Sequence, residues 1–314
     1  MRQSYGLSGG ALHSCEDDGA PLQLCIAPDE GERFWLQQRF GLGAHALASA
    51  LDPDEVSRVE FHEHSLFLIW KRPENYSANE RFAFEVSSFG MLLNERQLLL
   101  ISTADSLLSG LPSRPLEQPQ DVLLAILLGN IHHYQGHLKV IKLVARELQQ
   151  RSNQSMRNHH LLQMFGLSES LVYYLNAIQS NGAVLARLRS HGERSGFSAA
   201  NLELLDDLII ENEQCVKQAE IYSSVLAGLM DARGSLLNNT MNEMLRKLTL
   251  INVVFLPLNL IAGIGGMSEF SMMTQGIPWW LSYPLFIVAL TVLAALMLLA
   301  LRRLLGNPAR HPPD

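Results

Sequence analysis

The chain is poor in cysteine, has no long apolar run near its N-terminus and carries no excess of basic charge. Its three cysteines, Cys15, Cys25 and Cys215, are widely spaced, which argues against a disulfide framework or a CxxC metal site and is typical of reduced cytoplasmic thiols. The formal net charge of -7 offers no basic surface for nucleic acid. Because residues 1–20 are polar and glycine-rich, we expect no signal peptide.

Sequence motifs of common enzymes are also missing. There is no nucleophile elbow, phosphate-binding loop or dinucleotide fingerprint, so we expect neither catalysis nor a cofactor. Eleven histidines leave a structural zinc site as an alternative, because His133 and His137 are spaced i, i+4 on a predicted helix. No Glu stands between them as in a metalloprotease motif, and we favour solvated side chains. The other candidates are His132, His159 with His160, and His62 with His64.

Two uncharged apolar runs are present near the C-terminus. Residues 281–301, LSYPLFIVALTVLAALMLLAL, are long enough to span the ~30 Å hydrocarbon layer as a helix. Residues 248–264, LTLINVVFLPLNLIAGI, are fewer but continue upstream as a helical pattern. We therefore expect two membrane-spanning helices, and we expect the long preceding segment to stay on the side where it is made.

The basic residues next to these runs predict the orientation in the membrane. The loop 265–280 has no Lys or Arg, so the positive-inside rule places both termini in the cytoplasm of a bacterial-type inner membrane. Trp279, Trp280 and Tyr283 are expected to form an aromatic belt at the outer interface. The basic residues concerned are Arg246, Lys247, Arg302, Arg303 and Arg310.

The sequence before the apolar runs predicts an α+β cytoplasmic domain followed by a long helix. Strands are expected where Val, Ile, Phe and Leu partly alternate, over residues 22–27, 58–70 and 82–103. The three prolines of SGLPSRPLEQPQD mark the boundary of this domain. Apolar residues at helical spacing then predict helices over 119–150 and 159–190.

A Gly and Ser break at HGERSGFS precedes a segment without proline as far as Pro257. One stalk helix over 198–264, continuous with the first span, would be on the order of 100 Å long. We divide the chain into a cytoplasmic α/β domain (1–115), a helical region (116–197), the stalk and first transmembrane helix (198–264), an outer loop (265–280), the second transmembrane helix (281–301) and a basic cytoplasmic tail (302–314).

One face of the first span carries a polar stripe. Its members recur at intervals of three and four residues, which places them on one side of a helix. Packing between helices is the alternative, but it needs only one or two polar positions. Because one chain has two spans, we predict that several copies surround a narrow polar pathway. The stripe consists of Asn242, Leu245, Thr249, Asn252, Leu256, Asn259, Gly263 and Gly266.

The chemistry of the stripe favours a hydrated divalent cation. Neither span contains Asp, Glu, Lys, Arg or His, which disfavours a proton relay and a dehydrating carboxylate cage. Amide oxygens accept hydrogen bonds from water bound to a cation, which suits Mg²⁺, although softer divalent ions would also pass. Leu245 and Leu256 are candidates for apolar constrictions that gate by dewetting. Pro257 is equally consistent with a packing kink and with gating.

The segment NEMLRKLTLINVVFLPLNLIAGIGGMS, Asn242–Ser268, resembles the pore helix and signature turn of the CorA metal-ion transporters, including the related ZntB zinc transporters. The layout of domains is similar too, which implies a CorA-like funnel that is homopentameric around the first span. In that family a Gly-Met-Asn turn holds the first hydrated ion at the outer mouth, and here it reads Gly266, Met267 and Ser268. Serine lacks the amide carbonyl of asparagine, which slightly favours zinc over magnesium.

The resemblance also implies roles for single residues. Asn242 matches the cytoplasmic end of the pore, Leu245 an apolar gate, and Leu256 and Asn259 the positions that flank the proline. Glu269, the only charge between the spans, is interpreted either as an acidic ring that concentrates cations or as a solvated loop residue.

Two acidic residues are tentative regulatory metal ligands. Asp231 matches a stalk aspartate, and Asp207 falls at an acidic residue of the family's intracellular ion-sensing site, with a solvated helix face as the alternative. We expect a homopentameric channel or transporter for Mg²⁺ or Zn²⁺, with Co²⁺ and Ni²⁺ as further candidates. A non-conducting membrane-tethered sensor or scaffold is the alternative. The sequence leaves open the ion, the direction of transport and any proton coupling.

Overall fold

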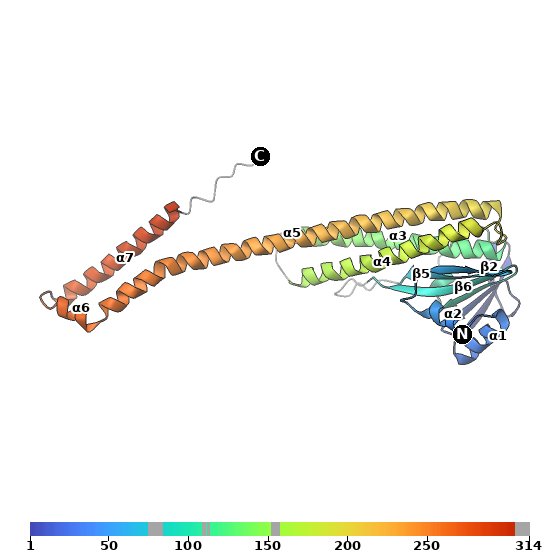
Figure 1. The fold of residues 1–314 in the computed structure, drawn as a ribbon, viewed down its shortest axis with the longest axis horizontal. Coiled ribbons are helices and arrows are strands. Elements are labelled where there is room, and N and C mark those ends of the chain that lie inside the picture. The colour runs from blue at the N-terminus through green and yellow to red at the C-terminus, as the bar shows by residue number, and fades with distance from the viewer. Residues whose placement is uncertain (75–83, 109–110, 112–113, 152–157, 305–314) are drawn as a thin grey trace. The chain divides into compact units, whose positions relative to one another are not determined.

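The computed structural model describes residues 1–74, 84–108, 111, 114–151 and 158–304, without the side chains of 148, 150, 151, 158–161, 269–271, 302 and 304. The chain separates into two compact units. The N-terminal unit comprises residues 1–230, and the C-terminal unit comprises residues 231–314. The helix α5 contributes to both (Figure 1).

A seven-stranded sheet forms the centre of the N-terminal unit. Its strand order is β2-β1-β3-β7-β6-β5-β4, and every neighbouring pair is antiparallel except β3 and β7. The predicted strand segments are confirmed in their described parts. The strands are β1 (Arg2–Ser8), β2 (Ala11–Cys15), β3 (Leu22–Ile26), β4 (Arg58–Phe61), β5 (Ser65–Pro73), β6 (Val86–Asn94) and β7 (Leu98–Ser102).

The hairpin of β1 and β2 was not predicted from the sequence. Its side chains are mostly half-buried or exposed, so the segment lacks the apolar alternation of an inner strand. The turn between the strands consists of Gly9 and Gly10, both with positive φ, at 61° and 78°. Two such residues favour a tight hairpin because their backbone twist matches that of the flanking strands.

Helices cover both faces of the sheet, which buries the central strands on both sides (Figure 1). The helices α1 (Glu30–Phe40) and α2 (Ala44–Leu51) pack on one face, where Phe67 and Ile69 of β5 point. Leu68 and Trp70 point to the other face, against α3 (Pro119–Arg151) and α4 (Asn158–His191), which share one core with the start of α5 (Ala199–Gly265). This double burial explains why β5 to β7 have nearly continuous apolar runs.

The three long helices agree with the predicted helical stretches. The break between α4 and α5 is a turn in which Gly196 has a φ of 77° and the Phe197 N–H bonds the Gly192 carbonyl at 3.0 Å. Ser198 then caps α5, because its hydroxyl accepts the Asn201 N–H at 3.2 Å. A one-turn 3₁₀ helix, η1 (Ser106–Leu108), lies between β7 and α3.

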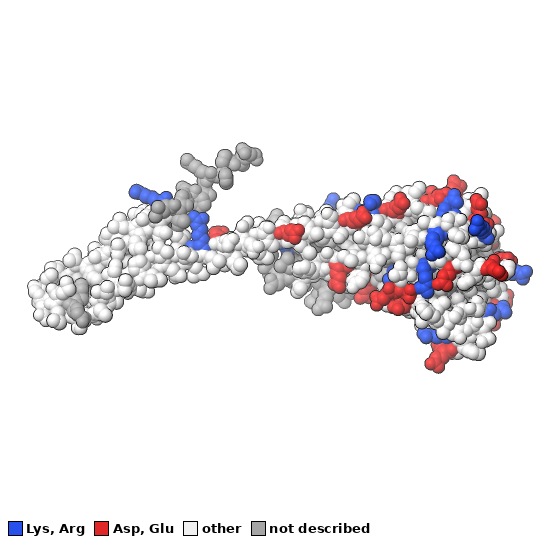
Figure 2. Space-filling view, viewed as in Figure 1, with Lys and Arg blue, Asp and Glu red and all other residues white. Residues whose placement is uncertain are grey.

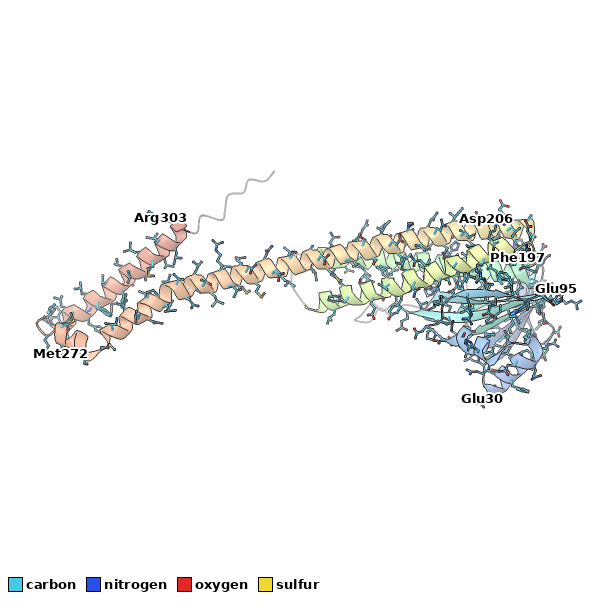
Figure 3. All side chains as sticks on the ribbon, viewed as in Figure 1. Glu30, Glu95, Phe197, Asp206, Met272 and Arg303 are labelled. Carbon is cyan, nitrogen blue, oxygen red and sulfur yellow. The ribbon has the colours of Figure 1, made fainter. Side chains whose placement is uncertain are left out.

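The C-terminal unit contains the end of α5, the short helix α6 (Ser268–Met273) and α7 (Trp279–Leu304). Among the described residues, α5 and α7 are the two helices long and apolar enough to cross a membrane, and their apolar stretches are almost entirely exposed. Lys, Arg, Asp and Glu are sparse over this part of the chain in Figure 2. Met272 on α6 and Arg303 near the end of α7 are labelled in Figure 3.

Candidate cation pathway

The predicted stripe lies on one helix, α5, as far as Gly263. All of its residues on α5 are exposed in the single chain, including the large apolar side chains of Leu245 (55%) and Leu256 (71%). These leucines alternate with amides on a helix that is long enough to span a membrane. Lipid or other copies of the chain therefore have to cover them. Their role as pore residues stays a prediction at this point.

The helix α7 contacts α5 at a residue that lies opposite the stripe. A Cβ on Gly265 would lie only 2.3 Å from Cζ of Phe286 on α7, so the two helices touch at this glycine. Val254 is also buried, at 6% exposure. Helix residues two positions apart point roughly 160° apart, so Gly265 lies opposite Gly263, and Val254 lies opposite Asn252. The stripe therefore has no covering helix within its own chain among the described residues.

The predicted stripe includes Gly263 but not Gly265, two residues further along the chain. The structure separates them, because a Cβ on Gly263 would meet nothing within 4 Å, whereas one on Gly265 would collide with Phe286. The signal that distinguishes them is their spacing: Gly263 continues the three-and-four repeat and Gly265 does not.

The hydroxyl of Thr249 has a fixed orientation on the stripe. Its Oγ1 donates to the Leu245 carbonyl oxygen, one turn earlier on α5, at 2.8 Å. This bond uses the single proton of the hydroxyl, so the oxygen offers only acceptor lone pairs outward. Thr249 is thus suited to accept hydrogen bonds from water bound to a cation.

Pro257 lies inside α5 without ending the helix. Because proline has no N–H, the carbonyl of Val253, four residues earlier, lacks its usual partner in the helix. A shallow groove on α5 surrounds this position and is lined by Thr249, Asn252, Val253, Leu256, Pro257 and Leu260.

The predicted signature turn is a tight connection between α5 and α6. The Gly266 N–H lies 3.1 Å from the Ala262 carbonyl and 3.2 Å from the Gly263 carbonyl, and the Met267 N–H bonds the Ile264 carbonyl at 3.1 Å. Ser268 is the first residue of α6, a helix that the sequence had not indicated. The side chain of Glu269 lies outside the described residues, so its acidic-ring role stays a prediction.

The two acidic candidates do not lie in a metal cluster. Asp207 and Asp231 are both exposed on α5, and the neighbouring Asp206 pairs with Arg189 of α4 at 2.7 Å. Within the described parts of the chain, no three His, Cys, Asp or Glu side chains form a group that could hold a metal ion. The regulatory role of Asp207 and Asp231 stays a prediction.

The histidine pair on α3 is not solvated, although the sequence had favoured solvated side chains: His137 is buried and His133 is half-buried. The Nδ1 of His137 lies 2.6 Å from the hydroxyl of Tyr174, and burial lowers the pKa of His137 to about 4, with a further contribution from His133. Burial also lowers the pKa of His133, as does the nearby Arg72. Both imidazoles are therefore neutral near pH 7.

The remaining histidines of the zinc alternative are dispersed. His132 points away from the pair, and its Nε2 lies 3.0 Å from Oε2 of Glu211 on α5. His62 and His64 are exposed, and the side chains of His159 and His160 lie outside the described residues.

Comparison with known proteins gives a consistent result. A sequence model of the family described as "CorA-like Mg2+ transporter protein" matches residues 25–303. The cobalt/magnesium transport protein CorA of Methanocaldococcus jannaschii is 23% identical over 277 residues, which are 85% of this chain and 86% of that protein. The protein of the same name from Thermotoga maritima is 32% identical over 90 residues, which are 29% of this chain and 25% of that protein.

Solved structures resemble the whole fold. The complete CorA magnesium transporter of Methanocaldococcus jannaschii superimposes with a TM-score of 0.72 at 21% identity and covers 96% of this chain and 95% of its own. The full-length CmaX protein gives a TM-score of 0.70 at 15% identity, with 96% of this chain and 97% of its own covered. These likenesses establish the α/β domain, the long helix and the C-terminal apolar helix as one known architecture.

Proposed function

Since the chain belongs to the family of CorA-like Mg2+ transporter proteins, we propose that it forms a homopentameric pathway for divalent cations across a bacterial-type inner membrane. Five copies of α5 surround the pathway, with both termini in the cytoplasm. Ions enter over Gly266, Met267 and Ser268 and pass Asn259, Asn252 and Asn242. The chain acts as a transporter and not as an enzyme, and the divalent cations are its substrates rather than resident cofactors.

The observation that carries this proposal is the placement of α7. The contact of α7 with α5 at Gly265 lies on the side of α5 away from the stripe. A span whose polar face is turned away from its own partner helix is stable in lipid only if other copies or water cover that face. In a closed ring of identical helices, neighbouring copies cover the edges of this face and water inside the ring covers its centre.

The ion class follows from the acceptors on the stripe. The amide side chains of three asparagines and the fixed hydroxyl oxygen of Thr249 can accept hydrogen bonds from a hydration shell, so the ion keeps its bound water. Mg²⁺ and Zn²⁺ are the leading substrates, with Co²⁺ and Ni²⁺ next. Glu269 concentrates cations at the mouth, and ions bound at Asp207 and Asp231 regulate flux.

Reconstitution of the purified chain in liposomes tests this function. Uptake of Mg²⁺, Zn²⁺, Co²⁺ and Ni²⁺ is measured with and without a pH gradient, and protein-free vesicles serve as the control. Flux of at least one ion is expected, and a response to the pH gradient separates a proton-coupled carrier from a channel. Absence of flux from folded pentamers would contradict conduction and favour the sensor or scaffold, an alternative motivated by Ser268 in place of asparagine.

A further inference from the structure

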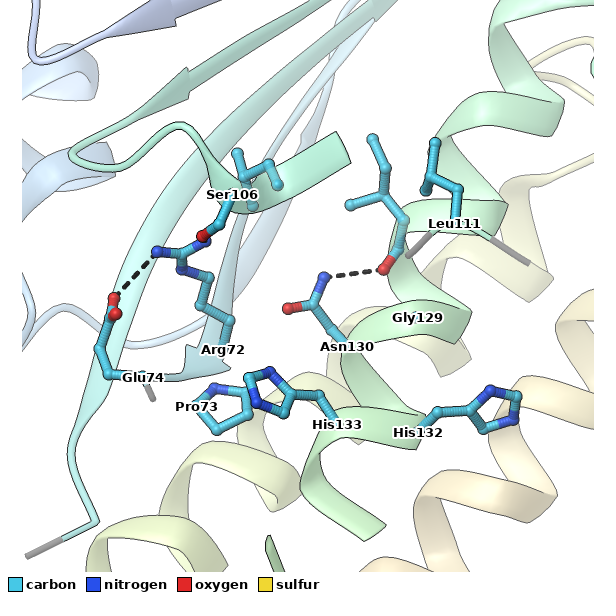
Figure 4. A pocket seen from close by; sticks show the side chains of 11 residues that line it. Arg72, Pro73, Glu74, Ser106, Leu111, Gly129, Asn130, His132 and His133 are labelled. Atoms are coloured by element: carbon cyan, nitrogen blue, oxygen red, sulfur yellow. Dashed lines mark hydrogen bonds and ion pairs between the residues drawn. The ribbon is translucent and has the colours of Figure 1, made fainter. Parts of the chain in front are cut away.

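A cavity of about 450 Å³ lies between the end of β5, η1 and α3 in the N-terminal unit (Figure 4). This volume is within the range of small-molecule sites. Its walls include a buried arginine, a histidine with a lowered pKa and a buried amide, namely Arg72, His133 and Asn130. Perturbed titratable groups in a cleft indicate a binding site. Nothing in the proposed cation pathway uses these residues.

Arg72 is held in one position at the wall of this cavity. The residue is only 5% exposed, and its Nε and Nη1 donate to the hydroxyls of Ser87 and Ser106 at 3.1 and 3.2 Å. Its Nη2 donates to Oε1 of Glu74 at 3.0 Å. A guanidinium has five N–H groups, so two have no partner among the described residues. A buried, preoriented guanidinium with spare donors is suited to binding an oxyanion.

Asn130 supplies an acceptor of fixed polarity on the other side of the cavity. Its Nδ2 donates to the Ile126 carbonyl at 2.7 Å, so its oxygen is the atom left to face the cavity. Figure 4 shows this oxygen on the side toward Arg72. His133, three residues further along α3, also lines the cavity, and its ring lies next to Pro73 and below Asn130 in the same view. Its neutral imidazole offers one N–H donor and one lone pair.

Glu74 limits the charge that the cavity accepts. Its carboxylate pairs with the edge of Arg72 that faces away from Asn130 (Figure 4). This pairing offsets the positive charge of the guanidinium, so a ligand of low negative charge fits better than a fully ionised one. A ligand that also carries a proton can donate to the Asn130 oxygen.

We propose that this cavity binds a protonated phosphate group, either as inorganic phosphate or as a small phosphomonoester. Two phosphate oxygens accept from Arg72 and His133, and the phosphate hydroxyl donates to Oδ1 of Asn130. The volume exceeds that of phosphate alone, which leaves room for an organic substituent. Sulfate has the same shape but no proton at neutral pH, so it leaves the asparagine oxygen opposite an unprotonated oxygen.

Calorimetric titration of the purified full-length chain tests this site. The probes are inorganic phosphate, glycerol phosphate and sulfate at the same ionic strength. Phosphate is expected to bind at least about tenfold more tightly than sulfate. Sulfate leaves Oδ1 of Asn130 without a donor, and a buried acceptor without a hydrogen bond costs free energy. Tighter binding of glycerol phosphate would identify a phosphomonoester as the ligand, and tighter binding of phosphate would identify the free ion. Equal affinity for sulfate, or no binding to folded protein, would overturn the proposal.

Two histidines provide matched variants. His133→Leu removes a donor beside Arg72 and is expected to weaken phosphate binding roughly tenfold to a hundredfold. His62→Leu changes an exposed histidine that does not line the cavity and is expected to leave the affinity within about twofold. Equal loss in both variants, or no loss in His133→Leu, would contradict the assignment. Arg72→Gln should abolish binding. If that variant does not fold, the comparison of the two histidine variants still tests the site.

Asn130→Ala tests the selectivity argument separately. The variant removes the acceptor that distinguishes the two anions, so the affinities for phosphate and sulfate are expected to converge. An unchanged preference for phosphate over sulfate would show that another group accepts the hydrogen bond of the phosphate hydroxyl. That result would overturn the role of Asn130.

Discussion

In the N-terminal unit, Asn181 and Asn212 are buried and bonded within the chain, whereas Asn242, Asn252 and Asn259 of the C-terminal unit are exposed on α5. Asn181 accepts the Ser57 hydroxyl at 2.7 Å and exchanges two hydrogen bonds with the backbone of Lys71. The side chains of the three exposed asparagines bond no other described residue. The same side chain thus fixes α4 to the sheet in one unit and needs a partner from outside the chain in the other.

Asn181→Leu should have the largest effect on stability. It removes the partners of the Lys71 N–H and carbonyl and of the Ser57 hydroxyl, at roughly 1–3 kcal/mol for each group left unsatisfied. We expect a loss of about 4 kcal/mol in the free energy of unfolding, measured with denaturant and circular dichroism. Asn176→Leu on the exposed side of α4 and Asn252→Leu on the stripe should each change it by less than about 0.5 kcal/mol. A large loss of unfolding free energy in Asn252→Leu would show that this asparagine also stabilises its own chain, and would contradict the difference between the two units.

The buried histidines make the N-terminal unit sensitive to acid. Burial lowers the folded-state pKa of His137 from 6.5 to about 4, so the unfolded chain binds more protons between these values. Stability is therefore fully present above pH 6.5 and is lost as the pH falls toward 4, by on the order of 3 kcal/mol. Unfolding of His137→Gln should show a shallower decline over this range. A decline as steep as that of the unmodified chain would contradict the role of His137, and His64→Gln on the surface is the control.

Gly263 and Gly265 distinguish the two faces of α5. Gly265→Ala places a methyl group against Phe286 and should cost roughly 1–3 kcal/mol in the stability of the C-terminal unit. Gly263→Ala meets no atom of its own chain, so thermal stability should be unchanged. In a pentamer it adds five methyl groups to the pathway, and flux should fall on the order of tenfold, or ~1.4 kcal/mol. The reverse pattern would place the pathway on the other face.

Thr249 should give the smallest effect. Thr249→Val keeps the shape but removes the acceptor oxygen, and flux should fall about fivefold, the equivalent of ~1 kcal/mol. Thr249→Ser retains a hydroxyl that can bond the Leu245 carbonyl, so its flux should match the unmodified chain. Equal flux in the valine variant would show that the threonine only shapes the helix.

The elements that the sequence predicts are those in which burial leaves a periodic pattern. The strands β5 to β7 and the helices α3 to α5 have long apolar repeats because both faces of the sheet and one face of each helix are covered. Helix α1 was missed, although Asp29 and Glu32 form a capping box, because its single buried residue, Leu36, gives no repeat. The six residues of α6 are too few for any pattern.

The polar stripe was predictable because helical spacing depends on the sequence alone. The spacing also leaves Gly265 off the stripe, but its contact with Phe286 was not predictable, since that depends on where α7 packs against α5. The cavity at Arg72 was missed for a similar reason. Its groups come from β5, η1 and α3, which are far apart in the sequence, and only the packing of α3 on the sheet brings them together.

Flux through the Asn259→Leu variant tests the central claim most directly. Liposomes with the unmodified chain and with the variant are compared for the divalent ion that the unmodified chain carries, after both are shown to form the same oligomer. A ring of leucines at this depth replaces the polar acceptors with an apolar constriction, so flux is expected to be abolished. Normal flux through folded Asn259→Leu oligomers would show that the stripe on α5 does not line the pathway.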